Sequence, residues 1–185
     1  IMKKIILLFS AVLISSASLN AQQVDFTEFD LENGLHVILH QDNSAPVVTT
    51  SVMYDVGGKD RENGRTGFAH FFEHMLFQGS KNVEDEQHFS LITESGGTLN
   101  GSTNSDRTNY YETVPANQLE KMLWLESDRM GYLLNGPAVT DKAFEVQRET
   151  VKNERGQRVD NRPYGLLSER MDEAMYPEGH PYSWS

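Results

Sequence analysis

The run Phe68–Phe77, FAHFFEHMLF, constrains the fold of this chain more than any other stretch. Seven of its ten residues are apolar, so as a helix it would be buried over most of its surface. It also carries two histidines and a glutamate, and an ionisable side chain in an apolar setting is costly unless another group pairs with it. The run therefore predicts a core helix whose few polar side chains share a partner.

His70, Glu73 and His74 form the pattern H-x-x-E-H. On a helix that turns by about 100° per residue, these side chains fall within one stripe of about 100°. Two imidazoles one turn apart can each direct a nitrogen at one metal ion, and the adjacent carboxylate lies beside any water on that ion. The stripe predicts a metal site, for which zinc is the simplest ion, and cobalt or manganese would also be accepted. The alternative is a pair of core histidines bonded to backbone, with Glu73 in an ion pair.

The chain has no cysteine, which excludes disulfides and thiolate ligands and leaves His, Asp or Glu as further metal ligands. His36 and His40 lie four apart on a predicted strand, hence about 13 Å apart and too distant to share an ion. His88 and His180 have no ligand-like neighbours in the sequence. These four histidines are expected to be ordinary surface or packing residues.

Alternating patterns between residues 24 and 55, with a hairpin signal at Asn33-Gly34, predict three antiparallel strands. Helices are predicted at 66–78, 85–94, 116–133 and 141–159, and a hairpin is predicted around the turn at 104–107. The glycine-rich loop 57–67 lacks the ending of a phosphate-binding loop. The order of elements predicts an α+β fold, a largely antiparallel sheet with helices packed on one face.

Residues 1–21 combine a short basic start, an apolar segment rich in small residues and a cleavage point after Ala21, which together predict a signal peptide. Its removal changes the formal charge from −11 to −13. Such acidity disfavours nucleic acid and anionic membrane surfaces as partners. We therefore expect an exported protein, periplasmic or secreted, with no stable membrane span after signal removal, whose residues 22–185 are the front part of a longer domain.

The sequence resembles the pitrilysin/insulinase group of zinc metallopeptidases with an inverted motif, which includes the mitochondrial processing peptidase. The resemblance rests on three blocks in the same order as in that family: TGFAHFFEHMLFQGS around the motif, GGTLNGSTNSDRTNYYETVP at 96–115, and QRETVKNERGQ at 147–157. It implies a processing-peptidase-like domain, here incomplete at its C-terminus, and a zinc-dependent endopeptidase acting on peptides or unfolded segments.

The resemblance also implies residue roles. His70 and His74 would be zinc ligands, Glu73 the general base that takes a proton from water, and Glu154 the third ligand. Glu149 is a competing third ligand, five residues earlier and about 140° round the same helix. Many relatives carry a glutamate seven residues before the third ligand; here Gln147 occupies that place, where an amide can still hydrogen-bond a ligand.

By the same resemblance, Asn100 and Gly101 match an asparagine and small-residue pair on an edge strand that receives the substrate backbone. Without the family, Asn-Gly is simply a turn signal. The family further implies a second homologous domain or subunit that completes the active-site chamber. Two rival interpretations stay open: a non-catalytic peptide-binding subunit of the same fold, and a structural zinc without an open position.

Overall fold

The computed structural model describes residues 24–61, 64–134 and 139–184. The chain divides into two compact units, one ending at Ala45 and one beginning at Pro46. The predicted signal peptide, residues 1–21, lies outside the described residues. Within the described parts of the chain, no helix is long and apolar enough to cross a membrane.

The described part of the first unit is a β-hairpin made of β1 (Thr27–Asp30) and β2 (His36–Leu39). Its turn is closed by the backbone of Leu31, whose N–H donates to the carbonyl of Leu35 over 2.9 Å. Gly34 adopts φ 85°, a conformation that side chains with a Cβ rarely take. The hairpin predicted from Asn33-Gly34 is thus confirmed.

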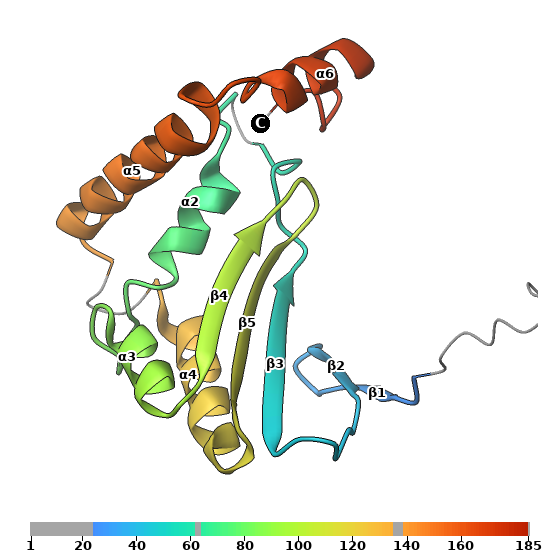
Figure 1. Cartoon of the computed structure of the whole chain (residues 1–185), viewed down its shortest axis with the longest axis vertical. Coiled ribbons are helices and arrows are strands. Elements are labelled where there is room, and N and C mark those ends of the chain that lie inside the picture. The colour runs from blue at the N-terminus through green and yellow to red at the C-terminus, as the bar shows by residue number, and fades with distance from the viewer. Residues whose placement is uncertain (1–23, 62–63, 135–138, 185) are drawn as a thin grey trace, which may run out of the picture. The chain divides into compact units, whose positions relative to one another are not determined.

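The second unit is built on a three-stranded antiparallel sheet in the order β3-β5-β4 (Figure 1). The strands are β3 (Val47–Tyr54), β4 (Thr98–Thr103) and β5 (Thr108–Pro115). The predicted hairpin is the β4–β5 pair, and its turn falls at residues 104–107 as expected.

The third of the predicted N-terminal strands, β3, does not continue the hairpin sheet of β1 and β2. It pairs with β5 along its whole length, from Val47 opposite Pro115 to Tyr54 opposite Thr108. Both strands have eight residues, whereas β2 has four. Pairing with β5 therefore satisfies the backbone groups along the whole side of β3 that faces β5, whereas the four-residue β2 could pair with only part of it.

Five α-helices lie in the described part of the second unit: α2 (Phe68–Met75), α3 (Gln87–Glu94), α4 (Leu119–Tyr132), α5 (Asp141–Arg155) and α6 (Leu167–Met175). A short 3₁₀ turn precedes α4, and a π-helix, η2 (Gly156–Asp160), follows α5. The helix predicted at 66–78 is shorter in the structure, because α2 begins at Phe68 after Gly67 as its N-cap and ends at Met75. At α5 the cap is a side chain, because the Thr140 hydroxyl accepts a hydrogen bond from the Ala143 N–H over 3.1 Å.

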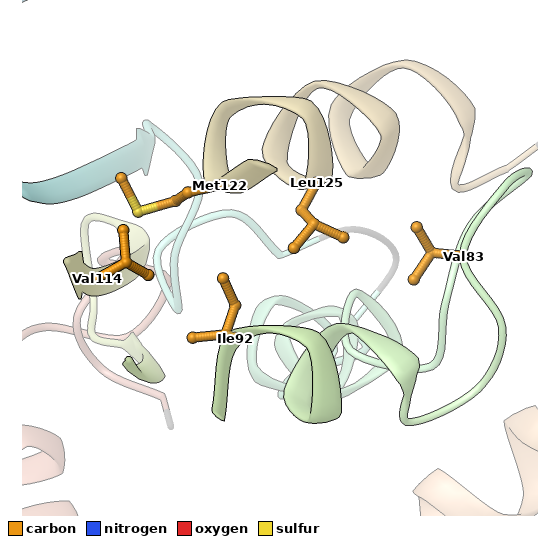
Figure 2. Close-up of a cluster of buried hydrophobic side chains, with 5 residues drawn as sticks. All are labelled: Val83, Ile92, Val114, Met122 and Leu125. Carbon is orange, nitrogen blue, oxygen red and sulfur yellow. The ribbon is translucent and has the colours of Figure 1, made fainter. Parts of the chain in front are cut away.

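The hydrophobic core lies between α3, α4 and one face of β5. Figure 2 shows its side chains converging from these elements and from the loop before α3. Burial of each such side chain stabilises the fold by roughly 1.5–3 kcal/mol. The cluster consists of Val83, Ile92, Val114, Met122 and Leu125.

The helices cover one face of the sheet. Alternate residues of β5, from Thr108 to Val114, are buried, and they contact α3, α4 and the chain that follows α2. Helix α5 runs alongside α2 (Figure 1), and the rings of Phe71 and Phe144 pack 4.8 Å apart between the two helices. The predicted α+β class with an antiparallel sheet is confirmed, and α2 lies between the sheet and α5.

Candidate metal centre

Three ligand-type atoms converge where α2 faces α5. The Nε2 atom of His74 lies 3.3 Å from that of His70 and 3.1 Å from Oε2 of Glu154. The same carboxylate oxygen is 3.5 Å from Nε2 of His70. One turn of α2 thus presents both imidazoles to a single oxygen that arrives from the last turn of α5.

These separations fit a zinc ion. Ligand atoms about 2.0–2.1 Å from one zinc at tetrahedral angles lie about 3.3–3.4 Å from one another, and the three observed separations are 3.1, 3.3 and 3.5 Å. Two imidazole nitrogens and a carboxylate oxygen are also a donor set that zinc accepts. His70, His74 and Glu154 can therefore hold one ion without rearrangement of the backbone.

Glu73 shares the polar stripe of α2 but points toward β4. Its Oε2 accepts a hydrogen bond of 2.5 Å from the hydroxyl of Thr103. That hydroxyl is also 3.2 Å from the hydroxyl of Thr108, which donates to the carbonyl of Val56 over 2.9 Å. Thr103 was not among the residues predicted from the sequence, and it fixes one oxygen of Glu73 while leaving the other available.

Asn100 and Gly101 lie within β4, so the turn interpretation of this pair is wrong. β4 is the outer strand of the described sheet, next to β5 only. A Cβ at Gly101 would come within 2.9 Å of Oε1 of Glu73, so this position needs a glycine for the carboxylate to lie against the strand. The Asn100 side chain accepts a hydrogen bond from the Gly101 N–H over 2.8 Å.

An open cleft of about 710 Å³ joins these groups. One wall is β4 and the other is α5 with the first turn of η2. Aromatic rings cover part of the surface between the two walls, and the α5 wall is polar. The lining includes His70, Glu73, His74, Phe77, Phe89, Asn100, Gly101, Thr103, Gln147, Glu154 and Arg158.

Of the two glutamates proposed as third ligand, only Glu154 faces the histidines. Glu149 lies on the exposed side of α5, where it accepts a hydrogen bond from Lys152 over 2.9 Å. Gln147 is buried and lines the cleft two turns before Glu154. The structure thus brings Gln147 to the side where a supporting hydrogen bond to the site is expected.

The histidines of the hairpin and of the C-terminal segment have other neighbours. His36 contacts Asp30 through Nδ1 over 2.8 Å, and His40 contacts the backbone carbonyl of Asp25 over 2.6 Å. The ring of His180 stacks on Tyr176 at 4.6 Å. His36 and His40 thus contact residues of their own unit, and His180 contacts a residue of the C-terminal segment.

His88, expected to be an ordinary surface or packing residue, instead belongs to a buried ionic cluster. It hydrogen-bonds Glu112 of β5, and Arg129 of α4 lies 2.9 Å from its Nε2. Arg129 is also 3.5 Å from Glu112 and 3.4 Å from Glu126. The ligand-type atoms of His88 and the two glutamates lie within 4.8 Å of one another, as do those of the cleft site. Arg129 already supplies the positive charge that a cation would bring.

Burial dominates the electrostatics of this cluster. It lowers the pKa of His88 to about 3, with the charge of Arg129 acting in the same direction. It raises the pKa of Glu126 to about 7 and also raises the pKa of Glu112. Near neutral pH His88 is therefore uncharged and Glu126 is close to half protonated. The sequence signal for the cluster was a glutamate between Tyr110 and Val114 on the buried side of β5.

Comparisons with known proteins identify a family whose members resemble this chain. The family described as Insulinase (Peptidase family M16) matches residues 36–182. The zinc protease PqqE of Helicobacter pylori is 32% identical over 187 aligned positions, which cover 99% of this chain and 41% of that protein. Human insulin-degrading enzyme is 27% identical over 160 positions, which cover 86% of this chain and 15% of that protein.

Two crystal structures share the fold. A protease from Helicobacter pylori superposes with a TM-score of 0.79 at 32% identity, over 88% of this chain and 38% of that one. Pitrilysin superposes with a TM-score of 0.73 at 25% identity, over 89% of this chain and 17% of that one. The chain thus spans less than half the length of these relatives. Because the family match extends over nearly all of the described residues, the chain belongs to the insulinase family of peptidases, peptidase family M16.

Proposed function

We propose that this chain forms the metal-binding part of a zinc-dependent endopeptidase that hydrolyses peptides or unfolded polypeptide segments. The observation that carries the proposal is the convergence of His70, His74 and Glu154 beside Glu73 in an open cleft. Relatives whose names describe them as a zinc protease and an insulin-degrading enzyme support it.

In this proposal the two histidines and Glu154 hold the ion. When bound, zinc polarises a peptide carbonyl as a Lewis acid and makes water more acidic. The side chains of His70, His74 and Glu154 are 39%, 23% and 20% exposed. A site reached so freely by solvent favours a catalytic metal with an open position over a closed structural one.

Glu73 is the general base. It accepts a proton from the attacking water at Oε1, the oxygen that Thr103 leaves free, and then donates this proton to the leaving amine. With the proton on Oε1, Oε2 remains an acceptor and keeps its hydrogen bond from the Thr103 hydroxyl. Thr103 therefore holds the same oxygen before and after the carboxyl group takes up the proton.

The outer edge of β4 is the proposed substrate platform. An extended peptide can add to such an edge through backbone hydrogen bonds, which would place its carbonyls along the wall that carries Asn100 and Gly101. The absence of a side chain at Gly101 keeps Glu73 close to this wall. A second homologous domain or subunit would close the opposite side of the cleft.

We also propose that the protein is exported, since residues 1–21 have the pattern of a cleavable signal peptide. Periplasmic or extracellular protein would then begin at Gln22. Recovery of the mature protein with residues 1–21 still attached would contradict this.

The test of the proposed function is peptide hydrolysis by the full-length protein with Glu73→Gln. This variant should lose about 10²- to 10⁴-fold in activity, the usual contribution of a general base, and should keep its zinc. Glu149→Gln, on the exposed side of α5, serves as the matched control and should stay active. A full-length wild-type protein that binds zinc and peptide but leaves the peptide intact would favour the non-catalytic binding subunit instead.

A further inference from the structure

We infer that Arg158 is the positioning residue for Glu154, and that it determines which carboxylate oxygen of this glutamate is available to a metal ion. The inference rests on the proposed metal site and assigns a role to a residue outside the ligand set. It comes from the observation that one carboxylate oxygen of Glu154 faces Arg158 and the other faces the two histidines.

The two carboxylate oxygens face different partners. Oε1 is 2.6 Å from Nη1 of Arg158, whereas Oε2 faces Nε2 of His74 at 3.1 Å and Nε2 of His70 at 3.5 Å. At this distance the guanidinium attracts Oε1 strongly. With Oε1 turned toward Arg158, the other oxygen, Oε2, is presented to the histidines.

Two arginines near the end of α5, Arg155 and Arg158, have different partners. α5 ends at Arg155, and the π-helix η2 continues the chain through Arg158. Arg155 makes two hydrogen bonds to Glu169 of α6, of 2.6 and 3.0 Å. One arginine thus ties α5 to α6, and the other faces the cleft, which it lines together with Glu154.

The exposure of the pair argues for a positioning role and against a role in stability. The Arg158 side chain is 75% exposed and that of Glu154 is 20% exposed. Ion pairs with an exposed partner add little to folding stability. Removal of Arg158 should therefore leave the fold intact and affect mainly the orientation of the ligand.

Two effects of Arg158 on metal binding have opposite signs. Groups that orient metal ligands typically contribute about 10- to 100-fold in metal affinity, so their loss weakens binding. The positive charge of the guanidinium repels a divalent cation, so its loss would tighten binding, but salt and water screen a charge this exposed. The inference requires that orientation outweighs repulsion.

Zinc affinity of the full-length protein, measured by competition with a chelator after metal removal, tests the inference. Arg158→Gln should bind zinc at least about 10-fold more weakly than wild type, and Arg158→Lys, which retains a donor, should lie between the two. Arg148→Gln is the matched control, because Arg148 lies on α5, the helix that carries Glu154, and pairs with Glu145 at 2.9 Å on the exposed side. Its zinc affinity should equal that of wild type.

The thermal unfolding midpoint of each metal-free variant separates folding from binding. Equal midpoints with weaker zinc binding in Arg158→Gln support the inference. An affinity equal to or tighter than wild type overturns it and leaves the proposed function standing. A wild-type protein that does not bind zinc would overturn the proposed metal site, and this inference with it.

Discussion

At the scale of the residue, helix α5 carries two glutamates five positions apart that differ entirely in their surroundings. Glu154 contacts both histidines and Arg158, while Glu149 contacts Lys152 in solvent. An isosteric change to glutamine removes the negative charge at either place without changing the volume of the side chain. Substituting each glutamate in turn therefore tests which carboxylate binds the metal.

We predict that full-length protein with Glu154→Gln loses its zinc, whereas Glu149→Gln retains one zinc per chain. The reason is that an amide oxygen is a much weaker ligand for zinc than a carboxylate. Mass spectrometry under native conditions measures the stoichiometry directly. Zinc retained in the Glu154 variant and lost in the Glu149 variant would reverse the assignment.

The sequence predicted part of this residue-level arrangement. The common stripe of His70, Glu73 and His74 follows from helical periodicity alone, and Glu154 came from the resemblance. Thr103 could not be found in this way, because its contact with Glu73 joins residues 30 positions apart through the packing of α2 on β4. The pairing of Arg158 with one chosen oxygen likewise depends on how α5 approaches α2.

At the scale of the element, β5 and α4 join through a buried ionic cluster next to the apolar core. Arg129 lies against the rings of both Phe77 and Tyr110, at 4.9 and 4.7 Å from their centres. Phe77 also lines the cleft. The cluster therefore supports the floor of the cleft from behind, and its protonation state bears on stability.

We predict that Glu126→Gln gains stability relative to wild type as the pH rises from about 4.5 to about 7. The raised pKa of about 7 in the folded state means that folded wild type holds a proton that the unfolded chain has released. Wild type therefore loses stability across this window, by at most about 3 kcal/mol at about 1.4 kcal/mol per pKa unit. The glutamine variant lacks this loss.

Unfolding of the two proteins in urea, followed by circular dichroism at several pH values, measures the difference. His88, with its pKa lowered to about 3, acts in the opposite direction between pH 3 and 6.5, but it is present in both proteins. Glu120→Gln, on the exposed side of α4, is the control. A difference between Glu126→Gln and wild type that is independent of pH would contradict the prediction.

Most elements were predictable from local patterns, and their partners were not. The pattern of residues 47–54 indicated a strand. The matched lengths of β3 and β5 explain why this strand pairs with β5 and not with the N-terminal hairpin. The start of α2 differed because Gly67, with φ 81°, turns the chain into the helix without a side-chain cap. Strand pairing and helix capping depend on contacts with other segments of the chain, and a local sequence pattern carries no information about those contacts.

At the scale of the whole molecule, this chain holds the proposed metal ligands and, in our proposal, one side of an active-site chamber. The cleft is open along β4 and α5, and several large apolar side chains of α6 and the segment before it are exposed, among them Leu167, Met171 and Met175. The relatives are more than twice as long as this chain. Substrate held on one wall only would be poorly oriented for attack, since orientation contributes a large share of the rate.

We therefore predict that residues 22–185, expressed alone, bind zinc but hydrolyse a test peptide at least about 10²-fold more slowly than the full-length protein, a loss of the size that misplacement of the reacting groups causes. The three proposed ligands all lie on α2 and α5, within one compact unit. Chelator competition measures the first property and fluorogenic peptide cleavage the second, with Glu73→Gln as the inactive reference in both lengths. If the short chain cleaves peptide as fast as the full-length protein, one wall suffices, and the remainder of the protein serves another purpose than completing the active site.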